Sequence, residues 1–384
     1  MMFHTSTIEI SKSALEQNIA FIKSILKNGV QLSSVVKGNA YGHGIEEFVP
    51  LAESCGINHF SVFSAEEARR VKESIITKPT IMIMGSLDKD QMAWAIENGI
   101  EFFVFNIQRL EEAKNISNQL NRKAIIHIEV ETGMNRTGIP VKELEYVISY
   151  LKEHSSYLQF KGLCTHYAGA ESIANYHRVK HQKKTFKKAC RIFEKHNLKP
   201  EINHTACSAA TIRYPKTQMD MVRIGIMQYG FFPTKEVLID YLGKTGTNIN
   251  PLKRLITWTS KVMDIKEVKA GEFIGYGTSY LANRDMNIAV IPVGYYHGFS
   301  RSLSNQGRVL INGHRIGVIG MVNMNMLTAD ITEINDISIG DMVTLIGTQG
   351  EQELSVASFS EFANQINYEI LARLPESIPR IVKV

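Results

Sequence analysis

Residues 33–44 read SSVVKGNAYGHG, a stretch in which a short apolar run leads directly into a lysine and a glycine-rich turn. Val35 and Val36 favour a β-strand, so Lys37 is expected at the end of that strand. Three glycines fall between residues 38 and 44, and glycine permits close approaches that other residues do not. The stretch therefore predicts a strand, a lysine at its end, and a tight turn packed against a ligand.

Seven similar runs follow this one, and helical patterns separate most of them. Together the eight predicted strands lie at residues 32–36, 59–63, 80–84, 102–105, 124–130, 160–166, 202–206 and 221–225. Ser64 and Glu67 have capping-box spacing, and apolar residues recur every three or four positions in 106–120, 141–154 and 174–196. Eight strand–helix repeats favour a (β/α)8 TIM barrel. A doubly wound open sheet is the alternative, but its G-x-G-x-x-G signature is missing after the first strand.

The pattern changes near residue 245. Residues 243–254, GKTGTNINPLKR, are rich in glycine and asparagine and are typical of a linker. Short alternating runs broken by glycines follow, and helical patterning returns only at 355–366. We therefore predict an α/β chain, with a barrel over residues 11–245 and a mostly β domain over 246–384. Residues 1–10 also alternate and could add a strand to the second domain or to the first.

Composition places the chain among ordinary globular proteins. It has 384 residues, 44% of them hydrophobic and 21% charged, with a net charge of +5. The basic cluster at 177–191 fits the solvent-exposed face of an amphipathic helix better than a surface that binds nucleic acid or a membrane. Four scattered cysteines suit a reducing compartment, and no signal peptide or spanning apolar run of ~20 residues is present. We expect a cytoplasmic protein without a metal site, a nucleic-acid partner or a membrane partner.

Polar residues follow five of the predicted strands. In a TIM barrel, functional side chains lie at the carboxyl ends of the strands. The five are Lys37, Arg136, His166, Ser208 and Arg223. Most have a structural alternative: Lys37 and Arg136 could lie at the surface, His166 could be a hydrogen-bonded core residue, and Ser208 could cap a helix. Their convergence on one rim favours a functional site.

This set of residue types suits pyridoxal 5'-phosphate. A lysine in a partly dry pocket has a lowered pKa and becomes a nucleophile toward carbonyl groups. Ser208 and the backbone amides of Gly225 and Ile226 suit a phosphate, and Arg223 suits the ring nitrogen. Arginine only donates hydrogen bonds, so it would keep that nitrogen unprotonated and favour proton return to Cα over transamination.

Beyond these single residues, longer motifs match a known family. VVKGNAYGHG, ETGMNRTG, VRIGI with QYG, GYGTSY, IPVGY and the terminal INYEI with PR occur here in the order found in alanine racemases. The chain resembles that family over nearly its whole length. The resemblance implies a barrel, a C-terminal β domain, pyridoxal 5'-phosphate, and a homodimer with shared active sites. It also implies an isomerase (EC 5.1.1.1) that interconverts L-alanine and D-alanine and supplies D-alanine for peptidoglycan synthesis.

The resemblance assigns roles to single residues. Lys37 and Tyr276, the latter from the partner subunit, match the two bases that act on opposite faces of the substrate α-carbon. Arg223 matches the arginine at the pyridine nitrogen, and His166 matches the histidine linking that arginine to the tyrosine. Arg136 and Met324 match substrate-binding positions, near the carboxylate. The positions that match cofactor contacts are Lys37, Tyr41, His166, Ser208, Arg223, Gly225, Ile226 and Tyr368.

Some positions depart from the family pattern. Where many members carry a carbamylated lysine this chain has Glu129, whose carboxylate we expect to supply the same charge and orient Arg136. Asn323 and Asn325 replace a cysteine and an aspartate near the expected substrate carboxylate. GYADG becomes GYYHG at 294–298, and HFATAD becomes HYAGAE at 166–171. The substrate range, alanine alone or also serine and other small amino acids, therefore stays open.

Three alternative functions remain on the sequence alone. The nearest is a serine racemase or a racemase of broader range on the same scaffold. The second is a barrel-type amino-acid decarboxylase, although those enzymes generally place a carboxylate at the ring nitrogen. The third is a cofactor carrier without turnover, although such proteins are typically a lone barrel.

Overall fold

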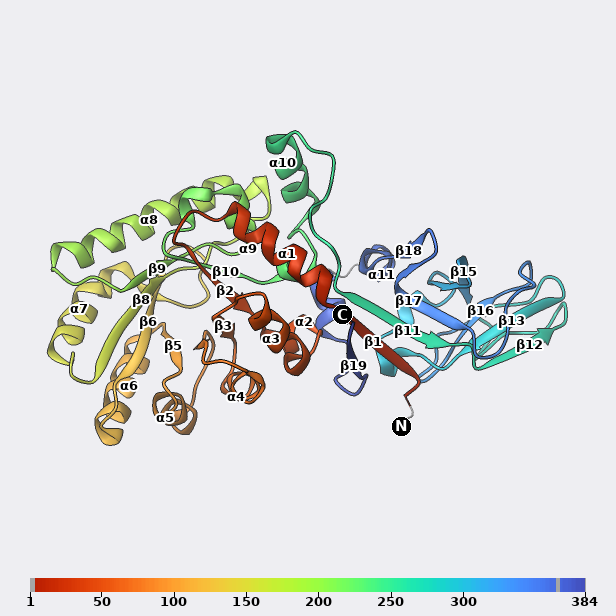
Figure 1. Cartoon of the computed structure of the whole chain (residues 1–384), viewed down its shortest axis with the longest axis horizontal. Helices are drawn as coiled ribbons and strands as arrows, with labels where there is room; N and C mark the ends of the chain where they lie inside the picture. Colours follow the sequence, from red (N-terminus) through yellow and green to blue (C-terminus); the bar gives the residue numbers. More distant parts are fainter. Residues whose placement is uncertain (1–3, 364–366, 384) are drawn as a thin grey trace. The chain divides into compact units, whose positions relative to one another are not determined.

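The chain folds into two compact units in the computed structural model, which describes residues 4–363 and 367–383 (Figure 1). The barrel unit comprises Ser13–Lys37 and Phe48–Arg254. The β unit comprises the chain up to Lys12, Gly38–Glu47, and the chain from Leu255 onward. The turn that follows Lys37 thus belongs to a different unit from the strand that precedes it.

Eight parallel strands form the barrel sheet, and every one of them overlaps a run predicted from sequence. Their order in the sheet is β10-β2-β3-β4-β5-β6-β8-β9 within the described residues. The two ends of this order meet, because Asp220 N donates to Asn203 O at 3.1 Å and Arg223 N donates to Ala206 O at 2.9 Å. The predicted barrel is therefore confirmed. The strands are β2 (Gln31–Val35), β3 (His59–Val62), β4 (Thr80–Ile83), β5 (Glu101–Val104), β6 (Ala124–Glu131), β8 (Leu158–Cys164), β9 (Ile202–His204) and β10 (Met221–Ile224); a short strand, β7 (Ile139–Pro140), pairs with β6.

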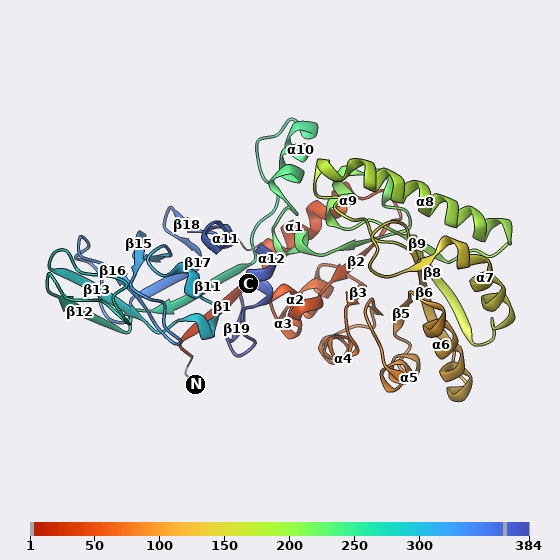
Figure 2. The same ribbon diagram turned by 180° about the vertical axis from the view of Figure 1, so that it is seen from behind.

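Helices surround these strands, as both views show (Figures 1 and 2). Side-chain caps begin some of them: before the helix Ala65–Ser74, the Ser64 hydroxyl accepts from Glu67 N, and the Glu67 carboxylate accepts in return from Phe63 N at 2.8 Å. Four helices begin one to three residues after the first residue of a stretch predicted to be helical; they start at Ala65, Ile107, Leu144 and Tyr176. The helices are α1 (Lys12–Ile25), α3 (Ile45–Ser54), α4 (Ala65–Ser74), α5 (Lys89–Glu97), α6 (Ile107–Leu120), α7 (Leu144–Glu153), α8 (Tyr176–Lys195), α9 (Ser208–Arg213) and α10 (Lys235–Thr245).

The barrel strands are buried on both faces, which is why they read as short continuous runs rather than alternating ones. Strands β3, β5 and β10 are buried at every residue. Met82, Phe103, Cys164 and Met221 form one apolar cluster that joins strands from around the barrel. Polar side chains share the buried strands with this cluster, among them Glu101, His127 and Arg223.

The β unit is built on a largely antiparallel sheet ordered β12-β13-β16-β15-β14-β17-β11-β1-β19, with β18 paired to β17. In β1, burial alternates residue by residue, and Ile8 pairs in register with Trp258 of β11. The N-terminal run thus contributes its strand to this sheet. The elements are β1 (Ser6–Ser11), β11 (Ile256–Lys261), β12 (Asp264–Val268), β13 (Met286–Ile291), β14 (Arg308–Ile311), β15 (His314–Ile319), β16 (Leu327–Asp330), β17 (Met342–Gln349), β18 (Gln352–Leu354), β19 (Arg380–Lys383), α11 (Val356–Ala363) and α12 (Asn367–Ala372).

Two expectations need adjustment. The segment 243–254 is not a free linker: Gly243 to Thr245 still belong to α10, and Asn18 holds Lys253 through two 2.7 Å hydrogen bonds. The helical stretch predicted at 355–366 is found as α11 as far as Ala363, and residues 364–366 lie outside the described residues. Within the described chain, no helix is both long and apolar enough to cross a membrane.

Candidate active site

Lys37 lies two residues after the buried end of β2 and begins a left-handed turn, α2 (Lys37–Tyr41). Gly38, Asn39 and Ala40 have φ values of 63°, 53° and 52°. This conformation costs a non-glycine residue about 1–2 kcal/mol, so the fold holds the turn against its local preference. Hydrogen bonds do so: Gly42 N donates to Gly38 O at 2.9 Å, and Ile45 N donates to the Asn39 side chain at 3.0 Å.

One glycine of this turn lies against the protein's own backbone. Gly42 has a φ of 81°, and a Cβ atom there would lie 1.9 Å from the carbonyl oxygen of Leu371 in α12. Both residues belong to the β unit. At Gly42 a side chain is therefore excluded by the backbone of α12, whereas at Gly38 a Cβ atom would meet only Ala372 Cβ, at 3.8 Å.

The surroundings of Lys37 make its amine easier to deprotonate. Desolvation by the surrounding protein lowers its pKa from 10.5, Arg136 lowers it further, Glu67 opposes the shift, and Arg223 adds to it. The side chain nevertheless keeps access to solvent, so desolvation is partial. No described residue accepts a hydrogen bond from this amine. A neutral, uncommitted amine is the state that attacks a carbonyl group.

Arg223 is the central cation of the barrel mouth. It lies in β10, which pairs with β2, and only 5% of its surface is exposed. Its Nη1 donates to the Nδ1 atom and to the carbonyl oxygen of His204, and its Nη2 donates to Thr165 O at 2.8 Å. Among the described residues, the Nε–H group and the second Nη2–H group have no acceptor. A guanidinium has five donors, so two remain for a ligand.

His166 stands near this cluster without bonding to Arg223. Burial lowers its pKa to about 3, with further contributions from Arg223, Arg136 and Lys37, so its ring is neutral at ordinary pH. We expected this histidine to link Arg223 to a tyrosine. Within the described chain, the histidine that accepts from the guanidinium is instead His204.

A glutamine that the sequence analysis did not single out fixes the backbone at His166. Gln182 of α8 is fully buried, although it lies on a helix dominated by surface lysines. Its Nε2 donates to His166 O at 2.9 Å, and its Oε1 accepts from Ala168 N at 2.9 Å. The signal that could have found it is a polar residue on the apolar face, three positions after Val179.

Ser208 and Gly225 are joined as the phosphate hypothesis requires. Ser208 begins α9 but does not cap it, because the N-cap residue is Cys207 and makes no side-chain cap bond. The Ser208 hydroxyl instead accepts from Gly225 N at 3.1 Å. Gly225 and Ile226 follow β10 directly and open the short helix η4 (Ile226–Tyr229). The three residues thus lie together beside the end of β10.

Glu129 is a buried carboxylate near the carboxyl end of strand β6. Only 5% of its surface is exposed, and burial raises its pKa. Hydrogen bonding from Thr137 and the charges of Arg223 and Arg136 act in the opposite direction. Arg136 itself is exposed on the loop after β6.

The remaining predicted residues belong to the β unit. Tyr41 and Tyr368 pack edge to face, with ring centroids 6.2 Å apart. Tyr276 lies between two glycines of positive φ and is 74% exposed. Met324 is 55% exposed, and its carbonyl oxygen accepts from Tyr296 N at 3.0 Å. Lys37 and Tyr276 belong to different units.

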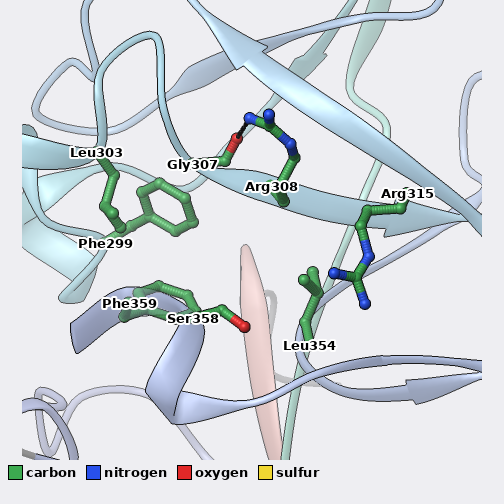
Figure 3. Close-up of a pocket in the computed structure, with 8 residues that line it drawn as sticks. All are labelled: Phe299, Leu303, Gly307, Arg308, Arg315, Leu354, Ser358 and Phe359. Carbon is green, nitrogen blue, oxygen red and sulfur yellow. Dashed lines mark hydrogen bonds between the residues drawn. The ribbon is translucent and has the colours of Figure 1, made fainter. Parts of the chain in front are cut away.

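One pocket of the β unit is separate from all of these residues (Figure 3). Its arginines are already engaged: Arg308 donates to Gly307 O at 2.9 Å, and Arg315 donates to Glu353 O at 2.8 Å. Its lining residues are Phe299, Leu303, Gly307, Arg308, Arg315, Leu354, Ser358 and Phe359. In the described part of the chain, no group of three or more acidic, histidine or cysteine side chains could hold a metal ion.

Comparison with known proteins gives a consistent result. The family described as alanine racemase, N-terminal domain, matches residues 10–233, and its C-terminal counterpart matches residues 255–382. An alanine racemase of Leptospira interrogans is 34% identical over 379 residues, covering 99% of this chain and 96% of that protein.

Solved structures agree in fold over the full length. An alanine racemase of Clostridium difficile superposes with a TM-score of 0.91 at 27% identity, covering 100% of this chain and 97% of that one. An alanine racemase of Bartonella henselae with covalently bound pyridoxal phosphate gives 0.85 at 26% identity, covering 99% and 100%. With both domains matched, the barrel and the β unit together make this chain a member of the alanine racemase family.

Proposed function

We propose that the chain interconverts L-alanine and D-alanine with pyridoxal 5'-phosphate held at the carboxyl end of the barrel. The observation that carries this proposal is the pairing of an uncommitted Lys37 amine with the buried donor Arg223 on the neighbouring strand. The family relationship supports the reaction itself. Bound pyridoxal 5'-phosphate would supply an electron-withdrawing ring that stabilises negative charge at the substrate α-carbon.

The residues present suit this group. The lowered pKa of Lys37 suits attachment of the cofactor aldehyde, and the two spare Arg223 donors suit its ring nitrogen. The Ser208–Gly225–Ile226 corner suits the phosphate, and Tyr41 and Tyr368 are proposed to lie beside it. Because arginine does not release a proton in proteins, the ring nitrogen would stay unprotonated and the reaction would return a proton to Cα.

Racemisation requires a base on each face of the α-carbon. We assign one face to Lys37 and the other to Tyr276 of a second copy of the chain, so the working unit would be a homodimer. The exposure of Tyr276 supports this assignment, because a side chain 74% open to solvent is available to another molecule. Arg136 and the backbone at Met324 would hold the substrate carboxylate, and His166 would stand between Arg223 and the second base.

The departures at Asn323 and Asn325 keep serine as a second candidate substrate. Both replace charged or reactive groups of the family pattern with neutral amides. Their position next to Met324 places them beside the proposed carboxylate site in sequence. Compartment and pathway placement, cytoplasmic and in the supply of D-alanine for peptidoglycan, follow from the family and belong to the same proposal.

The test is a chirality-resolved assay of the purified protein, loaded with pyridoxal 5'-phosphate, against a panel of L-amino acids. We expect D-alanine from L-alanine, with serine as the informative second substrate. Release of carbon dioxide and an amine would instead identify a decarboxylase. A bound-cofactor absorbance without any D-amino acid would identify a carrier and contradict the proposal.

A further inference from the structure

A line of buried polar side chains runs from Arg223 into the interior of the barrel. Arg223 Nη1 contacts His204 Nδ1, His204 Nε2 lies 2.9 Å from His127 Nδ1, and His127 Nε2 lies 2.8 Å from Glu101 Oε2. The four residues come from β10, β9, β6 and β5. Each of them is 5% exposed or less. This line is not used by the proposed reaction chemistry.

The direction of every hydrogen bond in this line follows from its first member. Arginine only donates, so His204 Nδ1 must accept and its proton must sit on Nε2. That proton points to His127 Nδ1, which must therefore accept as well, leaving the His127 proton on Nε2. Its acceptor is the Glu101 carboxylate. The line thus joins a buried cation to a buried anion through two neutral imidazoles of fixed tautomer.

The electrostatics of the interior agree with this assignment. Burial lowers the pKa of both His127 and His204, so both rings stay neutral. For Glu101, burial by itself would raise the pKa, but the hydrogen bond from His127 and the nearby His59 ring, whose Nε2 lies 3.6 Å from Glu101 Oε2, lower it to about 2. Burial raises the pKa of Glu129, the other buried carboxylate near Arg223. Glu101 is therefore the one that hydrogen bonds hold ionised.

The backbone makes room for this line. A Cβ atom on Gly162 would lie 2.0 Å from His127 Nδ1, although Gly162 has no positive φ that would require glycine. The register of β6 against β8 also shifts between Ile126 and His127. Phe103 packs against both rings and beneath Arg223, with centroid distances of 6.1, 5.8 and 5.9 Å. The imidazoles are thus confined by close neighbours as well as by their hydrogen bonds.

We propose that Glu101 is a positioning residue for the active site and acts through His127 and His204 to orient the Arg223 guanidinium. Both Nη1–H groups of Arg223 bond to His204, which fixes the plane of the guanidinium. The spare Nε–H and Nη2–H groups would then point toward the cofactor ring nitrogen in a single orientation. Loss of the Glu101 charge weakens the last hydrogen bond of the line, from His127 Nε2, and so loosens both imidazoles and the guanidinium that they hold. This inference rests on the proposed function only where it assigns the cofactor as the ligand of Arg223.

The first test compares Glu101→Gln with Ser117→Ala. The amide introduced by Glu101→Gln keeps an acceptor but has no charge. Ser117 is also fully buried in the barrel unit, but its hydroxyl donates to Tyr157 O at 2.6 Å, and its hydrogen-bond partners lie outside the line. We expect Glu101→Gln to weaken the affinity for pyridoxal 5'-phosphate about tenfold, or ~1.4 kcal/mol, and to shift the visible band of the bound cofactor. Ser117→Ala should leave both unchanged. Equal effects of the two variants would overturn the proposal.

A double-mutant cycle asks whether Glu101 acts through the line. In His204→Asn, the amide oxygen can still accept from Arg223, but the link to His127 is cut. In that background Glu101→Gln should have no further effect on cofactor affinity. Additive effects would mean that Glu101 acts independently of His204, and the proposal would be wrong.

A measurement on the unsubstituted protein covers the case in which the variants do not fold. In ¹⁵N-histidine-labelled protein, with and without pyridoxal 5'-phosphate, His127 and His204 should both carry a proton on Nε2 alone. A ring of His127 or His204 protonated at Nδ1 or at both nitrogens would contradict the hydrogen-bond directions on which the proposal rests. If the labelled protein shows these tautomers but binds no pyridoxal 5'-phosphate, the proposed function fails and the line stands.

Discussion

The interiors of the two units treat polar groups in opposite ways. Inside the barrel, Glu101 and Arg223 are buried in ionised form and connected by hydrogen-bonded histidines. In the β unit, the sheet around Ile8, Ile10 and Trp258 is mainly apolar, its buried polar side chains are the uncharged Ser6, Ser260 and Thr344, and Trp258 Nε1 has no partner among the described residues. Burying charge is unfavourable even when it is paired, so folding alone does not require the barrel arrangement. We therefore assign the buried charges of the barrel to the chemistry of the active site, and the core of the β unit to the stability of the fold.

The largest effect that would test this comparison is expected at Lys37. In Lys37→Ala we expect racemisation to fall by more than about 10⁴-fold, because both covalent attachment and one base are lost. The visible absorbance of the bound cofactor should disappear too. Lys161→Ala is the matched control, since Lys161 pairs with Glu201 at 2.6 Å in the same unit. Retained absorbance in Lys37→Ala would contradict the assignment.

Tyr276 is the one place where the β unit is proposed to take part in chemistry. Tyr276→Phe should lower racemisation by about 10²–10⁴-fold, the usual contribution of a general acid or base. Exchange of the α-hydrogen with solvent should persist for one alanine enantiomer, because Lys37 still serves one face. Tyr280→Phe removes a hydroxyl from a partly buried neighbour and is the control. Exchange lost equally for both enantiomers would argue against two separate bases.

Ile10→Ala tests the β unit as a source of stability. Ile10 is fully buried and pairs with Ile256. We expect the variant to lose about 2–5 kcal/mol of unfolding free energy, measured by urea denaturation, with unchanged cofactor affinity per folded molecule. Phe103→Leu is the counterpart in the barrel and should change cofactor affinity as well, because Phe103 contacts Arg223. Equal cofactor affinities of Ile10→Ala and Phe103→Leu would contradict the view that only the barrel interior supports the active site.

Acid should weaken the barrel through its neutral histidines. The pKa of His204 lies well below 6.5 in the folded chain, so below about pH 6.5 the unfolded chain binds a proton that the folded chain does not. Stability contributed by the neutral ring is therefore present above that pH and is lost as the pH falls. His204→Asn should reduce the pH dependence of unfolding between about pH 5 and 6.5 by at most about one proton, or ~1.4 kcal/mol per pH unit. An unchanged slope would mean that His204 is protonated in the folded state.

The smallest effect is expected at Glu129. If its carboxylate orients Arg136, Glu129→Gln should raise the KM for alanine by roughly 3- to 10-fold, with a smaller change in kcat, since a charged hydrogen-bond network would be weakened rather than removed. Steady-state kinetics in both directions measure this. Glu153→Gln, at an exposed helix end, is the control. If Glu129→Gln and Glu153→Gln had the same kinetics, Glu129 would have no role in substrate binding.

Much of the fold follows from local patterns in the sequence. All eight barrel strands are found where short β-rich runs predicted them, and the helices at Ser64, 106–120, 141–154 and 174–196 where capping-box spacing or helical periodicity did. The position of Lys37 after β2 follows for the same reason, because a short apolar run ending in a charged residue specifies its own boundary. The left-handed turn after Lys37 could not be predicted, since three of its four left-handed residues are not glycine.

By itself, then, the sequence determined the order of the strands and helices, the residues at the strand ends and the family to which the chain belongs. Only the tertiary structure decided that Arg223 bonds to His204 rather than to His166, and that Glu101 lies at the far end of the same line. Glu101 and His204 are more than a hundred residues apart in sequence and are linked through His127, because β5, β6, β8 and β9 follow one another in the sheet. Periodicity records which face of a strand is buried, whereas the partner across a closed barrel depends on register, and register is a property of the assembled sheet.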